Sequence, residues 1–148
     1  LPQELQRQTL FNEHYVSVAD KSGLPERGGL DLQQWLQRPH VLVAMRPDGP
    51  SEVDRVLAAQ GLQRRVALTL PHWTAACQVV AGTDLVLTIA SRSLASQRGL
   101  AQLRRFKLPI DVPAFAFEQV WHQRRGGDAA LSWLRQCIWQ CCQSGKSG

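Results

Sequence analysis

Apolar and polar residues alternate in blocks through the middle of the chain, as expected where strands and helices alternate. Continuous or alternating apolar stretches predict strands at 40–45, 65–70 and 85–90. Between these stretches, apolar residues three and four positions apart predict helices that begin at Ser51 and Pro71. Each helix is followed by a glycine that permits a left-handed stop. The order β-α-β-α-β predicts an α/β fold with a mainly parallel sheet flanked by helices.

The flanking segments carry weaker patterns. The pattern of residues 10–19 predicts one strand. Asp31 is expected to cap a short helix that Pro39 stops, and residues 91–105 are expected to be helical or irregular. A strand is expected near 115–121, followed by a helix capped by Asp128 and a disordered tail at 143–148. That last helix has an apolar stripe, made of Ala130, Trp133, Leu134, Cys137, Ile138 and Cys141.

Composition and charge narrow the class of protein. Of 148 residues, 44% are hydrophobic and 20% charged, and no apolar run approaches the roughly 20 residues that span a bilayer, so no membrane partner is expected. The net charge of +5 comes from 14 Arg against 3 Lys, but these are scattered, which favours a solvated surface over a nucleic-acid interface. The first residues lack the features of a signal peptide, and the sequence does not begin with Met. We therefore expect a cytoplasmic protein with reduced cysteines, and a piece of a longer chain.

Motifs of catalysis are missing from the sequence. It contains no Gly-rich phosphate loop, nucleophile elbow or zinc-protease motif, and its four histidines are far apart. The cysteines near 137–142 are better explained by packing than by metal or redox chemistry, because two of them share the apolar stripe of the last helix. We expect no enzymatic activity, no catalytic residue, no metal and no cofactor.

Geometry points to one edge of the predicted sheet. In open α/β sheets, ligands bind beyond the carboxyl ends of the strands, where helices begin. Two such places are the loop 46–51 and the segment 70–74, where helix starts offer unpaired N–H groups to an anion. Side-chain donors there are Arg46, Ser51, His72 and Thr74, with Trp73 as an apolar wall. The alternative is that both are simply well-formed helix starts.

The order of residues resembles the effector-binding domain of LysR-type transcriptional regulators, especially the nodulation-regulator-like branch. The resemblance lies in "LFNEHYVSVAD", "LDLQQWLQRPHVLVAM", "VDRVLAAQGLQRRVALTLPHW", "VVAGTDLVLTIASR" and "LPIDVPAFAFEQVWHQRRGGDAALSWLR". It covers the chain from about Leu10 to Arg135. The ending is the most specific part, since its Trp, His and Asp-Ala residues follow the family's order and spacing.

The resemblance implies a type 2 periplasmic-binding-protein-like domain of two α/β lobes joined by two crossover strands. Residues 1–20 would then be the first crossover, 21–106 the effector-binding second lobe, and 107–142 the second crossover with a strand and helix of the first lobe. Most of the first lobe and the winged helix-turn-helix that binds DNA in the family are absent from the sequence. DNA binding is therefore expected only through a part outside this chain, and a homo-oligomer through the parent protein.

The resemblance also implies residue roles. The family's effector lies in the cleft between the lobes, so it would contact the loop after the first strand of the second lobe and, more weakly, the next helix start. The expected effector is small and anionic or aromatic. The implied effector-binding residues are Arg46, Pro47, Asp48, Gly49, Ser51, Pro71, His72, Trp73 and Thr74. The implied hinge residues are Asn12, His14, Val16, Pro113 and Phe115.

Two other functions remain open from the sequence. One is a solute-binding protein of the same fold, which the missing signal peptide and first lobe disfavour. The other is a truncated interaction partner that forms mixed oligomers with an intact regulator, which is favoured by the exposed faces that would meet the first lobe, including the final helix. The leading interpretation is an effector-sensing, co-inducer-binding module that controls transcription through its parent.

Overall fold

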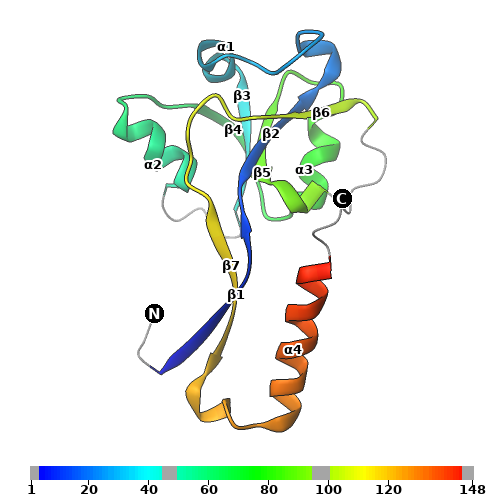
Figure 1. Ribbon diagram of the computed structural model, residues 1–148. Helices are drawn as coiled ribbons and strands as arrows, with labels where there is room; N and C mark the ends of the chain where they lie inside the picture. Colours follow the sequence, from blue (N-terminus) through cyan, green and yellow to red (C-terminus); the bar gives the residue numbers. More distant parts are fainter. Residues whose placement is uncertain (1–3, 45–49, 95–100, 145–148) are drawn as a thin grey trace. The chain divides into compact units, whose positions relative to one another are not determined.

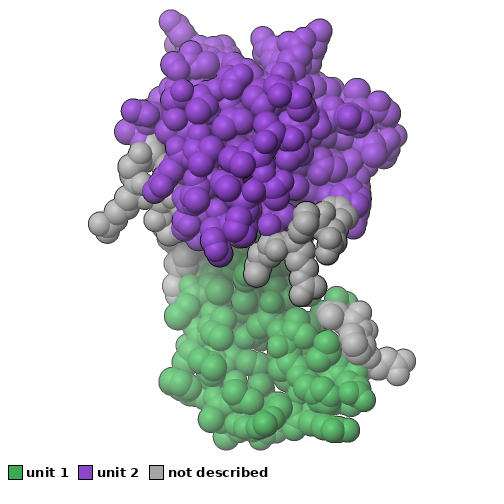
Figure 2. Space-filling view, turned by 180° about the vertical axis from the view of Figure 1, so that it is seen from behind, with its two compact units in different colours: residues 1–13, 114–148 green, residues 14–113 purple. Residues whose placement is uncertain are grey.

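The computed structural model describes residues 4–44, 50–94 and 101–144, and its chain divides into two compact units. Unit 1 combines residues 1–13 with 114–148, and unit 2 consists of residues 14–113 (Figure 2). The sequence placed the corresponding boundaries at 20/21 and 106/107. The chain passes from one unit to the other at His14 and Pro113, two of the expected hinge residues.

Unit 2 is built on a five-stranded sheet in the order β4-β3-β5-β2-β6 (Figure 1). Its strands are β2 (Tyr15–Asp20), β3 (Pro39–Val43), β4 (Arg65–Leu70), β5 (Val86–Ala90) and β6 (Leu103–Phe106). β3 pairs in parallel with β4 and β5, whereas β2 is antiparallel to both β5 and β6. Four of the five strands therefore run the same way, which confirms the predicted α/β class, with β2 as the one reversed strand.

Three helices connect these strands. They are α1 (Leu32–Gln37), α2 (Glu52–Ala59) and α3 (Trp73–Val80), with short 3-10 turns at η1 (Lys21–Gly23) and η2 (Ser91–Leu94). The predicted cap of α1 is confirmed, because the Asp31 carboxylate accepts the Gln34 amide at 2.8 Å and the Gln34 side chain returns the bond. Gly61 and Gly82 both have positive φ, as expected for the residues that end α2 and α3.

Helices cover both faces of the sheet. On one face, Ala76, Cys77 and Val80 of α3 pack in a cluster with Val16, Val18 and Val41. On the other face, Trp35 of α1 and Leu57 of α2 pack with Phe106 and Leu108. Burial of these side chains is the main force that holds unit 2 together.

Buried polar groups join the second cluster. The Trp35 indole donates to the Ser17 hydroxyl at 2.9 Å, and the His40 ring lies edge-on to Trp35 with centroids 4.3 Å apart. His40 Nε2 lies 2.8 Å from the Trp35 carbonyl oxygen. Because a carbonyl only accepts, this ring nitrogen carries the proton. Burial lowers the pKa of His40 to about 4, so the ring is neutral at pH 7.

Unit 1 consists of two antiparallel strands, β1 (Leu5–Glu13) and β7 (Phe115–His122), the turn η3 (Gln123–Arg125) and helix α4 (Ala129–Ser144). Phe11 stacks on Phe117 across the strands, with ring centroids 5.0 Å apart. The Asp128 carboxylate accepts the Leu131 amide at 3.1 Å, which confirms the predicted cap of the last helix.

Several sequence expectations were wrong in detail. The single strand predicted over 10–19 is two strands in different sheets, broken at His14, and the first begins at Leu5. The segment 91–105, expected to be helical or irregular, ends in strand β6. Helix α3 starts at Trp73 and not at Pro71, because His72 has the extended φ of −126° of a cap residue. Residues 143–144, expected to belong to a disordered tail, complete α4, and 145–148 lie outside the described residues.

Candidate functional site

The carboxyl ends of β3, β4 and β5 lie at one edge of the unit 2 sheet. Val43 pairs with Leu70, and the Ala44 amide donates to the Leu70 carbonyl at 3.0 Å. The reversed strand β2 starts at this edge, where Tyr15 pairs with Ala90. The structure therefore brings the starts of α2, α3 and η2 to the same edge, which we call the carboxyl edge.

Ser51, an expected effector residue, is the cap of α2. Its hydroxyl donates to the Asp54 carboxylate at 2.6 Å and accepts the Asp54 amide at 3.2 Å. It also accepts from Arg64 at 3.1 Å. One hydroxyl offers one donor and two acceptor positions, so all of them are occupied. The Ser51 side chain thus serves the fold of the edge and has no free hydrogen-bonding group for a ligand.

The Arg64 side chain stabilises the start of α2 through its contacts with Ser51 and Asp54. Its side chain is only 2% exposed and forms a two-pronged ion pair with Asp54, with N–O distances of 2.7 and 3.2 Å. Burial raises the pKa of Asp54, but hydrogen bonds from Arg64 and Ser51 and the charge of Arg64 outweigh it and hold that pKa below its usual value. Sequence reasoning missed Arg64, because an arginine directly before a strand gives no signal of burial.

The start of α3 is more open than that of α2. Pro71, His72 and Thr74 are exposed, and the His72 side chain makes no cap hydrogen bond to the helix. Trp73 is half-buried and packs against the α3-side cluster. The first amides of α3 therefore lie at the carboxyl edge without a side-chain cap, next to two exposed polar side chains.

The remaining expected residues lie in different places. Arg46, Pro47, Asp48 and Gly49 fall outside the described residues. Of the expected hinge residues, Asn12 and Phe115 lie in the β1–β7 pair of unit 1, whereas Val16 is buried in the core of unit 2. His14 is exposed, and its carbonyl accepts the Ser91 amide at 2.9 Å. Their role as a hinge stays a prediction.

A cavity of about 510 Å³ opens at the other end of the carboxyl edge. Its lining combines Tyr15 and Val16 of β2 with Ser91 and with Arg105, Phe106 and Lys107 at the end of β6. Burial raises the pKa of Tyr15, and the nearby Glu52 carboxylate raises it further. Sequence reasoning missed this cavity, because β6 was not predicted as a strand.

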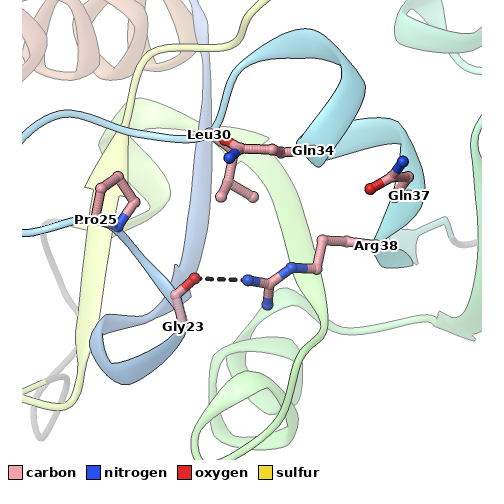
Figure 3. Close-up of a pocket in the computed structure, with 6 residues that line it drawn as sticks. All are labelled: Gly23, Pro25, Leu30, Gln34, Gln37 and Arg38. Atoms are coloured by element: carbon pink, nitrogen blue, oxygen red, sulfur yellow. Dashed lines mark hydrogen bonds between the residues drawn. The ribbon is translucent and has the colours of Figure 1, made fainter.

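A second cavity, also of about 510 Å³, lies at the opposite edge of the sheet between η1 and α1 (Figure 3). Arg38 borders it and donates to the carbonyl oxygens of Gly23 at 2.6 Å and Asp84 at 3.4 Å. These bonds join Arg38, which directly precedes β3, to η1 and to the segment before β5. The Arg38 guanidinium therefore has a structural role, and this cavity is not our candidate site.

Neither a metal-binding cluster nor a membrane-spanning helix is found in the part of the chain that the structure describes. Within 4–44, 50–94 and 101–144, no three His, Cys, Asp or Glu side chains gather as a metal site. No helix among the same residues is both long and apolar enough to cross a membrane.

Unit 1 exposes a large apolar surface. Phe117 and Val120 of β7 are 52% and 46% exposed, and α4 exposes Trp133 at 68% together with Leu134 and Ile138. The predicted apolar stripe of α4 therefore faces away from β1 and β7, toward which the helix turns Arg135 and Gln143 instead. Large exposed apolar side chains on both elements are typical of interfaces with further polypeptide.

Comparison with known proteins agrees with this architecture. Residues 1–143 match the LysR substrate binding domain family. The chain is 31% identical over 132 residues to the transcriptional activator NahR of Pseudomonas putida, covering 87% of this chain and 43% of NahR. It is 27% identical over 135 residues to nodulation protein D 1 of Sinorhizobium fredii, covering 90% and 42%. It thus spans less than half the length of these relatives.

A solved structure shows the same fold. The regulatory domain of MexT, a transcriptional activator of Pseudomonas aeruginosa, superposes with a TM-score of 0.80 at 27% identity, covering 95% of this chain and 69% of that one. Fold and comparisons together define a regulatory α/β domain of the periplasmic-binding-protein-like type. The chain belongs to the LysR substrate binding domain family. The resemblance seen in the sequence is confirmed.

Proposed function

We propose that this chain is the effector-sensing part of a LysR-type transcriptional regulator and that it binds a small molecule at the carboxyl edge of unit 2. The single observation that carries the proposal is the convergence of three parallel strand ends and two helix starts at that edge, in a chain of this family. Ligands of open α/β sheets bind at such edges because helix amides and loops meet there.

The two helix starts have different roles in this proposal. The start of α2 is closed by Ser51, Asp54 and Arg64, so it acts as a rigid support. The start of α3 is not capped by a side chain, so its amides, with His72 and Thr74, contact the effector, and Trp73 forms an apolar wall. The residues 46–49 between β3 and α2 complete the site in our proposal.

In this proposal, the parent protein transmits the signal of effector binding to DNA. A ligand shifts a conformational equilibrium only by the difference of its affinities for the two states. We propose that effector binding changes the balance between arrangements of the two units, with His14 and Pro113 as the hinge. The exposed apolar face of α4 and β7 supports assembly with further polypeptide of the regulator, and DNA is bound by a domain outside this chain.

A ligand screen tests the proposal. Small carboxylates, phenols, amines and sugars are titrated calorimetrically into the chain at pH 7. A compound of the effector class binds with a Kd below about 1 mM and loses about tenfold in affinity in the His72→Ala/Thr74→Val variant. The matched control is Gln78→Ala, an exposed change one turn further along α3. Binding that ignores His72 and Thr74, or no binding of any class, would contradict the proposal.

A further inference from the structure

Helix α4 carries an apolar stripe that its own unit does not cover. The stripe is made of residues at helical spacings of three and four: Ala130, Trp133, Leu134, Cys137, Ile138 and Cys141. All of them are exposed except Cys137, which is half-buried. The opposite side of the helix faces the strands, where Arg135 lies over the Trp121 ring and Gln143 donates to the Leu10 carbonyl.

Unit 1 buries little apolar surface by itself. Neither hydrophobic cluster contains a residue of unit 1, and Leu10 is its one buried apolar side chain among the described residues. A two-stranded sheet needs a well-packed apolar face to be stable in water. Covering the stripe with another apolar surface would therefore stabilise unit 1.

Charge does not oppose contact of this stripe with a copy of itself. Arg135 is the only charged residue in 129–144, and its guanidinium carbon lies 4.5 Å from the centre of the Trp121 ring, on the sheet side of the helix. A helix that faces water ordinarily carries charged residues on its outer side. Two copies that meet through the stripe bring no like charges together.

The order of large and small residues in the stripe favours an antiparallel partner. The stripe is symmetric about the midpoint of 135–136, so a two-fold axis there sets each residue opposite the mirrored position of a second copy. The facing pairs are Trp133 with Ile138, Leu134 with Cys137, and Ala130 with Cys141. Each larger side chain thus meets a smaller one, whereas a parallel pair would set Trp133 against Trp133. Antiparallel helix dipoles also attract each other.

We propose that two copies of this chain associate through α4, as an antiparallel helix pair whose two-fold axis passes next to residues 135–136. The central seam has the 4-3-4 spacing at which helices pack along each other at a small crossing angle. The contact covers about three helical turns, which is a small interface, so the expected Kd is on the order of 10 µM. This inference rests on the assembly included in the proposed function and names its partner.

Another occupant of the stripe is further polypeptide of the parent regulator, since the chain covers only 69% of the MexT regulatory domain. That explanation predicts that the chain by itself stays monomeric. A second copy on the stripe predicts a dimer with a defined pairing of positions, so the two explanations differ in a measurable way.

Disulfide cross-linking of the whole 148-residue chain tests the pairing. In Ala130→Cys/Cys137→Ala/Cys142→Ala, the thiols at positions 130 and 141 face each other across the antiparallel pair. Mild oxidation with diamide should therefore convert most of the protein to a covalent dimer on a non-reducing gel. The buried Cys77 is kept in every variant.

Two matched variants control for chance collisions. In Cys137→Ala/Cys142→Ala, the two Cys141 thiols of an antiparallel pair lie about 16 Å apart along the seam, so little dimer should form. In Gln136→Cys/Cys137→Ala/Cys142→Ala, the new thiol is exposed but lies outside the stripe, and it too should give little dimer.

Sedimentation under reducing conditions measures association without a cross-link. The wild-type chain is expected to show a monomer–dimer equilibrium. Leu134→Glu should weaken it at least about tenfold, because two carboxylates would meet near the two-fold axis. Gln136→Glu, on the same helix but outside the stripe, should leave it unchanged.

Each other outcome overturns the inference. A wild-type chain that stays monomeric up to about 0.5 mM leaves the stripe to further polypeptide of the regulator. Equal cross-linking of all three cysteine variants excludes the antiparallel pairing, and unchanged association of Leu134→Glu shows that copies meet elsewhere. The proposed effector site is judged separately, because His72 and Thr74 lie in unit 2 and are tested by ligand titration.

Discussion

Removing the charge of Asp54 tests how strongly the ion pair between Asp54 and the buried Arg64 stabilises unit 2. The Asp54→Asn change leaves the Arg64 guanidinium, whose side chain is 2% exposed, without its counter-charge. Breaking a buried pair costs about 3–5 kcal/mol, because the remaining charge stays desolvated. Since the Asp54 side chain is 27% exposed and water reaches it, we expect a loss of about 2–3 kcal/mol in the free energy of unfolding.

Urea unfolding measures this loss. The Trp35 indole N–H, which donates to Ser17, gives an NMR signal that reports unit 2 alone. The control is Glu52→Gln in the same helix turn, where an exposed pair with Arg55 is lost, and it should cost less than about 1 kcal/mol. Adding Arg64→Met to Asp54→Asn should restore at least about 1 kcal/mol, because no buried cation remains. A cost of Asp54→Asn equal to that of Glu52→Gln would refute the reasoning.

Three further predictions concern packing, pH and assembly. A Gly29→Ala variant should be less stable by about 1–3 kcal/mol, because its Cβ would lie 2.6 Å from Phe106 Cγ, while Gly127→Ala, whose Cβ meets no atom within 4 Å, should be neutral in the same thermal unfolding assay. Since the pKa of His40 is about 4 in the folded chain, the unfolded chain takes up its proton first; stability should be full above pH 6.5 and fall by up to about 3 kcal/mol as the pH drops toward 4. Urea titrations at several pH values should show this slope in the wild type and lose most of it in His40→Gln; an equal slope in both would exclude His40 as the cause. Finally, Trp133→Ser/Ile138→Ser should weaken self-association of the chain in analytical ultracentrifugation, whereas Gln136→Ser on the same helix should not, and equal sedimentation of all three proteins would remove α4 from the interface.

Local patterns predicted the parts of the fold that depend on neighbours in sequence. The Asp31 and Asp128 caps, strand β4 and the core face of α3 could be predicted because capping and helical periodicity act within a few residues. The break at His14 could not, since 10–19 is uniformly strand-like and only pairing with distant strands assigns its halves to separate sheets. Strand β6 was missed because Arg104 and Arg105 interrupt its apolar pattern, as charges do on an edge strand.

The candidate site was predictable in position and less so in its residues. Strand order alone located the carboxyl edge, since parallel strands end together. The occupied hydroxyl of Ser51 was not predictable, because it depends on Arg64, thirteen residues away and buried. The cavity beside Arg105 was not predictable either, because it exists only through the pairing of β6 with β2, and the scattered arginines were interpreted as solvated surface.

The position of a bound ligand tests the central claim most directly. A ¹H–¹⁵N NMR titration of the chain with a compound that binds should shift the amides of 72–74 and Ser91 most strongly, at the carboxyl edge. Shifts confined to unit 1, or to the cavity between Gly23 and Arg38 at the opposite edge of the sheet, would contradict the account.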